Sequence, residues 1–230
     1  MDSLASGFAD GQIVRWLPPQ SDAPPFSAAS DEALLASLLS LVLLAGADVA
    51  ASRAIVRFGS FAAVLAAPER DLRGIPGLGT HGIAAIKLLH AAAVRLARAG
   101  VIGRPVLESW DGVIAYLTAV MARERIEQFR ILFLDAKGHL RADEAQARGT
   151  VNHTPVYPRE VVRRALELEA AAVILVHNHP SGDPAASTED IEMTGRIMAA
   201  ATAVGVVVRD HVIIGNGRWL SFRAEGLLTG

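Results

Sequence analysis

The sequence contains no cysteine, which excludes disulfide bonds, thiolate metal ligands and cysteine nucleophiles. Residues 1–10 lack the basic start and apolar run of a secretion signal. The longest apolar stretch, residues 33–47, is interrupted by Ser37 and Ser40 and is too short to span a bilayer. We therefore expect a cytoplasmic protein without membrane association, in which only His, Asp or Glu can bind a metal such as zinc.

Charge is sparse and unevenly distributed. The chain of 230 residues has a formal net charge of −2. Residues 1–50 carry one basic and six acidic side chains, whereas residues 51–104 carry eight basic and two acidic ones. Only this middle block has a charge that suits an anionic polymer. A solvated helical face would give the same pattern, so both interpretations stay open.

The spacing of apolar residues divides the chain into three parts. Residues 1–29 are rich in Pro, Ser and Ala, which indicates a flexible leader. Residues 30–104 have helical spacing and begin with Ser30 as a candidate N-cap, so they predict an all-helical domain. Residues 105–230 alternate helical and strand patterns around a continuous apolar strand at 172–177. This part predicts a mixed α/β fold with a mixed sheet between helices.

The richest candidate chemistry lies in residues 176–190. Alternate residues of a strand point to the same face, so His177 and His179 at the strand end would present both imidazoles to one side. Pro and Gly then turn the chain, and Asp190 falls in the first turn of a helix that begins at Ser187. Two His and one Asp leave one position of a tetrahedral zinc ion for water, which is the pattern of a catalytic site.

Each part of this segment also has a simpler interpretation. Ser187 and Asp190 fit the capping pattern of a helix start. A lone His-x-His pair is more often a hydrogen-bonded surface pair than a metal site. The combined spacing favours the metal site.

The pattern H-x-H-x7-S-x2-D resembles the signature of the JAMM (MPN+) metalloproteases. The longer run His-Asn-His-Pro-Ser-Gly-Asp-Pro at 177–184 is similar to the RadC branch of that superfamily, although Ala186 stands where that branch commonly has Pro. The resemblance covers residues 105–230 and, more weakly, 30–104. It implies a three-layer JAMM/MPN-type domain with one zinc ion per chain. Further similar segments lie at 127–135, 148–151, 156–162 and 210–215.

The resemblance also implies a catalytic glutamate at the start of the first strand of this domain. Glu127 matches by position, and Glu124 is the alternative. Such a carboxylate takes a proton from zinc-activated water and passes it to the leaving amine. In such enzymes Ser187 would donate to the oxyanion, in competition with its role as a helix cap. His153 and His211 are secondary candidates outside the core site.

The segment Ile75-Pro76-Gly77-Leu78-Gly79 resembles a helix-hairpin-helix element, which RadC-type proteins carry ahead of the metal domain. Backbone amides of such a hairpin can hold a DNA phosphate without reading sequence. The candidate contacts are Gly77, Gly79 and Lys87. A basic residue often follows the second glycine in DNA-binding examples, whereas this chain has Thr80 and His81 there.

Three functional hypotheses follow. The first is a zinc-dependent hydrolase of amide or isopeptide bonds in an unknown protein or peptide substrate. The second is a DNA-associated accessory protein with weak, non-specific DNA binding and a structural metal domain. The third is a metal-dependent hydrolase of a non-protein substrate.

Overall fold

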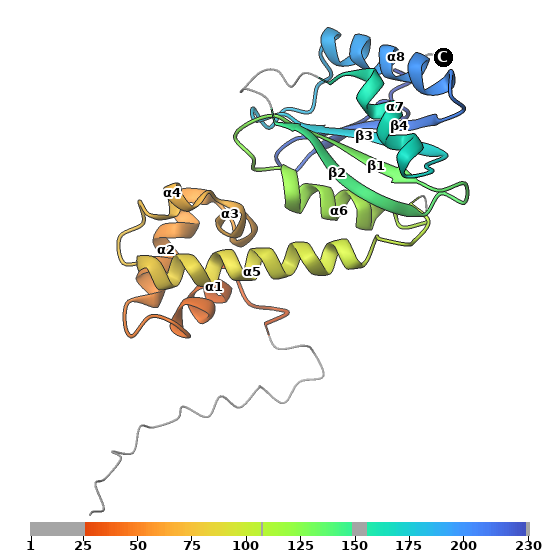
Figure 1. The fold of residues 1–230 in the computed structure, drawn as a ribbon. Helices are drawn as coiled ribbons and strands as arrows, with labels where there is room; N and C mark the ends of the chain where they lie inside the picture. The colour runs from red at the N-terminus through yellow and green to blue at the C-terminus, as the bar shows by residue number, and fades with distance from the viewer. Residues whose placement is uncertain (1–25, 107, 149–155, 229–230) are drawn as a thin grey trace, which may run out of the picture.

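The computed structural model describes residues 26–106, 108–148 and 156–228, so most of the leader predicted at 1–29 lies outside the described residues. The helices and strands follow one another as shown in Figure 1. The helices are α1 (Asp31–Ser40), α2 (Ala47–Phe58), α3 (Phe61–Ala66), α4 (Glu69–Leu72), α5 (Gly79–Ala99), α6 (Trp110–Met121), α7 (Pro158–Glu167) and α8 (Thr188–Thr202). The strands are β1 (Gln128–Leu134), β2 (Leu140–Arg148), β3 (Ala172–Asn178), β4 (Val207–Ile214) and β5 (Trp219–Ser221).

Helices α1 to α5 surround a hydrophobic core of their own, which includes Leu35, Leu39, Leu72 and Ile86. The predicted cap at Ser30 is confirmed, because its hydroxyl oxygen accepts a hydrogen bond of 3.2 Å from the Ala33 amide at the start of α1. The all-helical character predicted for this region is also confirmed. Among the described residues, no helix is both long and apolar enough to cross a membrane.

The long helix α5 connects the helical region to the rest of the molecule (Figure 1). Near its start, Ile83 and Ile86 belong to the helical core. Near its end, Val94 and Ala97 pack against the core beneath α6. One helix therefore serves both cores, and the predicted division between residues 104 and 105 stays a prediction.

The second region contains a five-stranded sheet in the order β2-β1-β3-β4-β5. Only β3 and β4 are parallel, while the other neighbouring strands are antiparallel. Helix α6 covers one face, and α7 and α8 cover the other (Figure 1). The predicted mixed α/β architecture with a sheet between helices is confirmed.

Strand β3 is buried along its whole length, as its continuous apolar run predicted. Ile174 and Val176 pack toward α6, whereas Val173 and Leu175 pack toward α7 and α8. The alternation places His177 on the α7–α8 face. Strands β3 and β4 are parallel, so the chain leaves the carboxyl end of β3 and returns along α8 to the start of β4. This crossover brings the end of β3 close to the start of α8.

Candidate metal site

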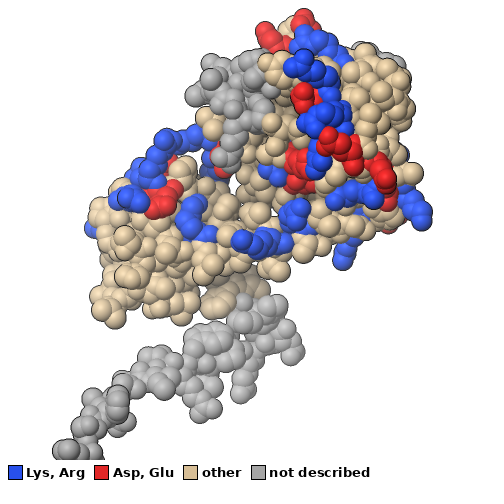
Figure 2. Space-filling model, in the orientation of Figure 1, with Lys and Arg blue, Asp and Glu red and all other residues tan. Residues whose placement is uncertain are grey.

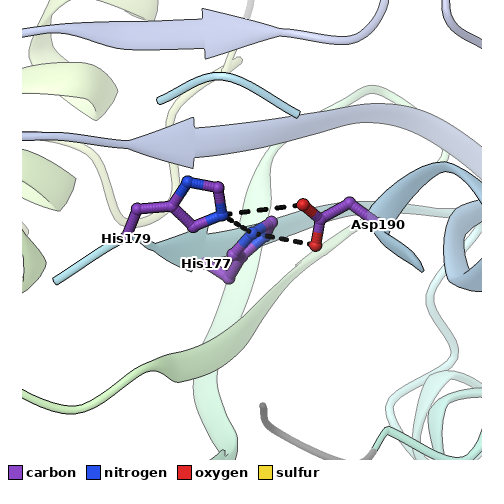
Figure 3. A group of neighbouring side chains, drawn as sticks. All are labelled: His177, His179 and Asp190. Atoms are coloured by element: carbon purple, nitrogen blue, oxygen red, sulfur yellow. Dashed lines mark hydrogen bonds and ion pairs between the residues drawn. The ribbon is translucent and has the colours of Figure 1, made fainter. Parts of the chain in front are cut away.

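Three potential metal ligands meet where β3 ends and α8 begins: His177, His179 and Asp190 (Figure 3). The two Nε2 atoms are 2.9 Å apart. The Asp190 carboxylate lies 3.1 Å from His177 Nε2 through Oδ1 and 3.6 Å from His179 Nε2 through Oδ2. Donors bound tetrahedrally at about 2.0–2.1 Å are about 3.3 Å apart. The spacing of the three side chains therefore fits a tetrahedral metal ion.

Strand geometry continues just past the end of β3 and explains why the two histidines converge. Asn178 is the last residue of β3, yet the His179 amide still donates to the Ile214 carbonyl of β4 at 3.0 Å. The period of two is thus kept through His179. The prediction that both imidazoles leave one face is confirmed by their contact.

The orientation of His179 is set by the loop that follows it. Its Nδ1 lies 2.8 Å from the Asp183 carbonyl oxygen, which can only accept a hydrogen bond. Nδ1 therefore carries a proton, and Nε2 is the ring nitrogen that faces Asp190 and His177. This loop lies very close to the β4–β5 turn. A Cβ added at Gly215 would lie only 2.4 Å from the Gly182 carbonyl oxygen, so only glycine fits there.

A buried chain of hydrogen bonds sets the tautomer of His177. Thr194 Oγ1 donates to the Asp190 carbonyl at 2.6 Å, so it must accept from His211 Nδ1, also at 2.6 Å. His211 Nε2 then accepts from His177 Nδ1 at 2.8 Å. The remaining nitrogen of His177, Nε2, is directed at Asp190 and His179. Burial, followed by the nearby His177, holds the pKa of His211 well below its usual value, so this ring is neutral.

The structure therefore gives His211 a position that the sequence left open. Its register in β4 places it beside Leu175 of β3, on the face that carries His177. A histidine within an apolar strand was the available signal, but the pairing of β3 with β4 decides which ring it contacts. His153 lies outside the described residues.

Ser187 and Asp190 form the predicted capping box at the start of α8. The Ser187 hydroxyl oxygen accepts from the Asp190 amide at 3.1 Å, and Asp190 Oδ2 accepts from the Ser187 amide and hydroxyl at 2.9 and 2.6 Å. Burial would raise the pKa of Asp190, but hydrogen bonds from His177, His179 and Ser187 outweigh it and hold the pKa well below its usual range. The cap thus keeps the carboxylate ionised and aimed at the histidines.

An open cleft of about 970 Å³ lies in front of these ligands. Glu127, which immediately precedes β1, lines this cleft together with His179, Ser187 and Asp190. Glu124 instead lines a smaller neighbouring cavity of about 230 Å³, and its charge acts on Lys87. Of the two candidate bases, Glu127 is therefore the one beside the metal ligands.

Asn178 connects the segment that carries Glu127 to the histidine pair. Its Oδ1 accepts from the Gln128 amide at 2.9 Å, and its Nδ2 donates to the Ile126 and Glu124 carbonyls at 3.3 and 3.4 Å. Asn178 thus holds the segment before β1, and its two neighbours are candidate metal ligands. The sequence pattern included this residue between the histidines but assigned it no role.

Replacing Asn178 with Ala is expected to destabilise the fold by about 1–3 kcal/mol, because it leaves the buried Gln128 amide without its acceptor. Urea denaturation measures this loss. An alanine variant as stable as the unchanged protein would contradict the role of Asn178 in holding this segment.

The candidate DNA contacts are not among the residues that line the cleft. Gly77, in the turn before α5, and Gly79, the first residue of α5, are exposed and have φ values of 89° and 59° that favour glycine. The Lys87 amine instead donates to the Ala67 and Leu65 carbonyls at 2.6 and 3.0 Å, just after and near the end of α3. Burial lowers the pKa of Lys87. The structure thus places the lysine inside the helical region, and its contact with DNA stays a prediction.

A mixed sheet between helices, with a His-x-His pair and an Asp gathered at one strand end, is the arrangement of a JAB (JAMM-like) domain. Residues 107–227 match the family model described as a RadC-like JAB domain, and the chain belongs to the RadC family. It is similar to a UPF0758 protein of Rhodobacter capsulatus, with 58% identity over 178 residues that cover 77% of this chain and 83% of the relative. It is also similar to a UPF0758 protein of Ruegeria pomeroyi, with 55% identity over 171 residues that cover 74% and 76%. The predicted resemblance to RadC is confirmed.

Proposed function

We propose that this protein is a zinc-dependent hydrolase of amide or isopeptide bonds, with a protein or peptide as its substrate. One observation carries the proposal. With Nδ1 of His179 donating to Asp183 and Nδ1 of His177 donating to His211, the two Nε2 atoms and the ionised Asp190 carboxylate face one another within 2.9–3.6 Å. Three potential ligand atoms at this spacing can bind one cation between them. Two imidazoles and a carboxylate are a ligand set typical of catalytic zinc.

A zinc ion held by His177, His179 and Asp190 would activate a water molecule as the nucleophile. Glu127, beside the ligands in the cleft, takes the proton of that water as its oxygen bonds to the carbonyl carbon. When the carbon–nitrogen bond breaks, Glu127 returns the proton to the departing amine. The same residue thus acts first as base and then as acid.

Ser187 would stabilise the negative charge that develops on the carbonyl oxygen. Its hydroxyl lone pair accepts from the Asp190 amide, which maintains the helix cap, while its proton is donated to Asp190 Oδ2. The lone pair would keep the cap, whereas stabilisation of the oxyanion would turn the proton from Asp190 Oδ2 to the carbonyl oxygen. The start of α8 adds a favourable partial positive charge at the same place.

The test is the appearance of new amines in a protein extract. Amines already present are blocked, and the extract is then incubated with tag-free protein that is zinc-loaded, chelator-stripped or stripped and reloaded. The proposal expects about one zinc per chain and new amines only with the loaded and reloaded protein. Absence of stoichiometric zinc, or equal cleavage by the stripped protein, would overturn it.

Zinc affinity is expected to weaken as the pH is lowered, because protons compete with zinc for His179. The hydrogen bond with Asp190 raises the pKa of this imidazole, and burial opposes the shift only in part. A raised pKa means that a proton occupies the ligand nitrogen at a higher pH, and zinc must displace it. Affinity should therefore weaken by about tenfold per pH unit, beginning above the usual histidine value of about 6.5. Competition with a chromophoric chelator between pH 5.5 and 8 measures this; a constant affinity would contradict it.

DNA association is the second candidate, and the exposed hairpin at Gly77 and Gly79 favours it. Binding of the full chain to duplex DNA should then weaken steeply with salt, because each neutralised phosphate releases counterions. The engagement of Lys87 with α3 carbonyls leaves this candidate with less support than the hydrolase.

A further inference from the structure

The cleft in front of the candidate metal site is lined in part by a residue outside the RadC-like domain. Arg70 of α4, in the helical region, lines the cleft together with Arg125 from the segment before β1. Further lining residues come from the loop after β3 and the start of α8. They are His179, Pro180, Ser181, Ser187, Glu189 and Asp190.

A short ion pair joins the helical region to the segment that carries Glu127. Asp71 lies 2.7 Å from the Arg125 guanidinium, and its own side chain is only 13% exposed. Because Arg125 stands two residues before Glu127, this ion pair holds α4 beside the segment with the proposed base. The presence of Arg70 in the cleft thus follows from a defined contact between the two regions.

The two arginines carry two positive charges, whereas the ion pair with Asp71 offers them one carboxylate. Asp71 is 2.7 Å from Arg125 but 3.9 Å from Arg70. In the described part of the chain, no other carboxylate lies within 4.0 Å of either guanidinium. The side chains of Arg70 and Arg125 are 67% and 57% exposed, so both can reach a ligand in the cleft. Figure 2 shows basic side chains gathered over α4, on the side of the helical region that faces the sheet.

We infer that Arg70 and Arg125 form a subsite for a carboxylate of the substrate, so that the scissile amide lies close to an acidic side chain or to a chain terminus. This inference rests on the proposed function and specifies its substrate class. A guanidinium group matches a carboxylate through two parallel hydrogen bonds, and Arg125 already contacts one in Asp71.

The remaining charges of the cleft favour an acidic peptide over a nucleic acid. Glu127, Glu189 and Asp190 line the same cleft. A polymer with a phosphate at every residue would place several negative charges near these carboxylates. A peptide with a single carboxylate at the arginine wall avoids that repulsion while its amide bond reaches the metal ligands.

The test uses peptide hydroxamates, whose hydroxamate group binds zinc, with the zinc-loaded full chain. Matched probes carry Glu or Gln one, two or three positions from the hydroxamate. We expect at least one Glu probe to bind about tenfold more tightly than its Gln partner, and this preference to decrease with salt. Arg70→Gln should abolish most of the preference. Arg73→Gln, which removes an exposed arginine paired with Glu69 away from the cleft, should retain it.

The outcomes separate the inference from the proposed function. If no hydroxamate binds, the zinc site itself is wrong and the inference is overturned with it. If Glu and Gln probes bind equally, or if Arg70→Gln keeps the preference, only the carboxylate subsite is overturned. A single-stranded oligonucleotide that competes with the probes and depends on Arg70, without any preference for Glu, would assign the wall to phosphate instead.

Discussion

Loss of stoichiometric zinc is the expected result of replacing Asp190 with Asn. The amide has nearly the same size and can still accept a hydrogen bond from Ser187, so the start of α8 should persist. It lacks the negative charge that faces the two imidazoles at 3.1 and 3.6 Å. Substitutions that only remove a partner of a metal ligand weaken metal affinity by about 10- to 100-fold. Loss of a ligand should exceed this range.

Chelator competition measures the change, and Glu189→Gln is its matched control. Glu189 neighbours Asp190 in the first turn of α8 and lines the same cleft, but it is not among the three ligands. The control removes the same charge from nearly the same place and should keep its zinc affinity within a few fold. If both variants bind zinc as the unchanged protein does, Asp190 is not a ligand.

The part of the site that could be predicted from sequence is the part with local geometry. His177 and His179 are two residues apart at the end of a strand, so the pleat alone directs them to one side. Ser187 and Asp190 are three residues apart at a helix start, where the capping box has a fixed shape. In both cases the relative position of the side chains follows from dihedral angles within a few residues.

Contacts between distant segments could not be predicted in the same way. His211 contacts His177 because β4 pairs with β3 in one particular register, and an apolar strand pattern does not specify that register. Arg70 reaches the cleft because Asp71 pairs with Arg125 across two regions whose patterns are read separately. Both contacts involve residues around the predicted ligands. The sequence therefore indicated the ligands themselves better than the residues that surround them.

Replacement of Glu127 with Gln should have the largest effect on turnover. The amide keeps the shape of the side chain but can no longer accept a proton from water. General base catalysis contributes about 10²- to 10⁴-fold, and hydrolysis should fall by this factor. Zinc content should be unchanged, because Glu127 is not one of the ligands. The measurements are the rate of new-amine formation and the zinc content of the same samples.

Glu124→Gln is the control that distinguishes the two candidate bases. Glu124 lies three residues earlier in the same segment but lines the neighbouring cavity, where its charge acts on Lys87. Its replacement should leave both turnover and zinc content nearly unchanged. The reverse result, with activity lost in Glu124→Gln and kept in Glu127→Gln, would move the base to Glu124. If Glu127 is the base, its inactive variant should still hold a substrate against the metal ligands, so that proteins retained by zinc-loaded Glu127→Gln and released on chelation identify what the cleft accepts.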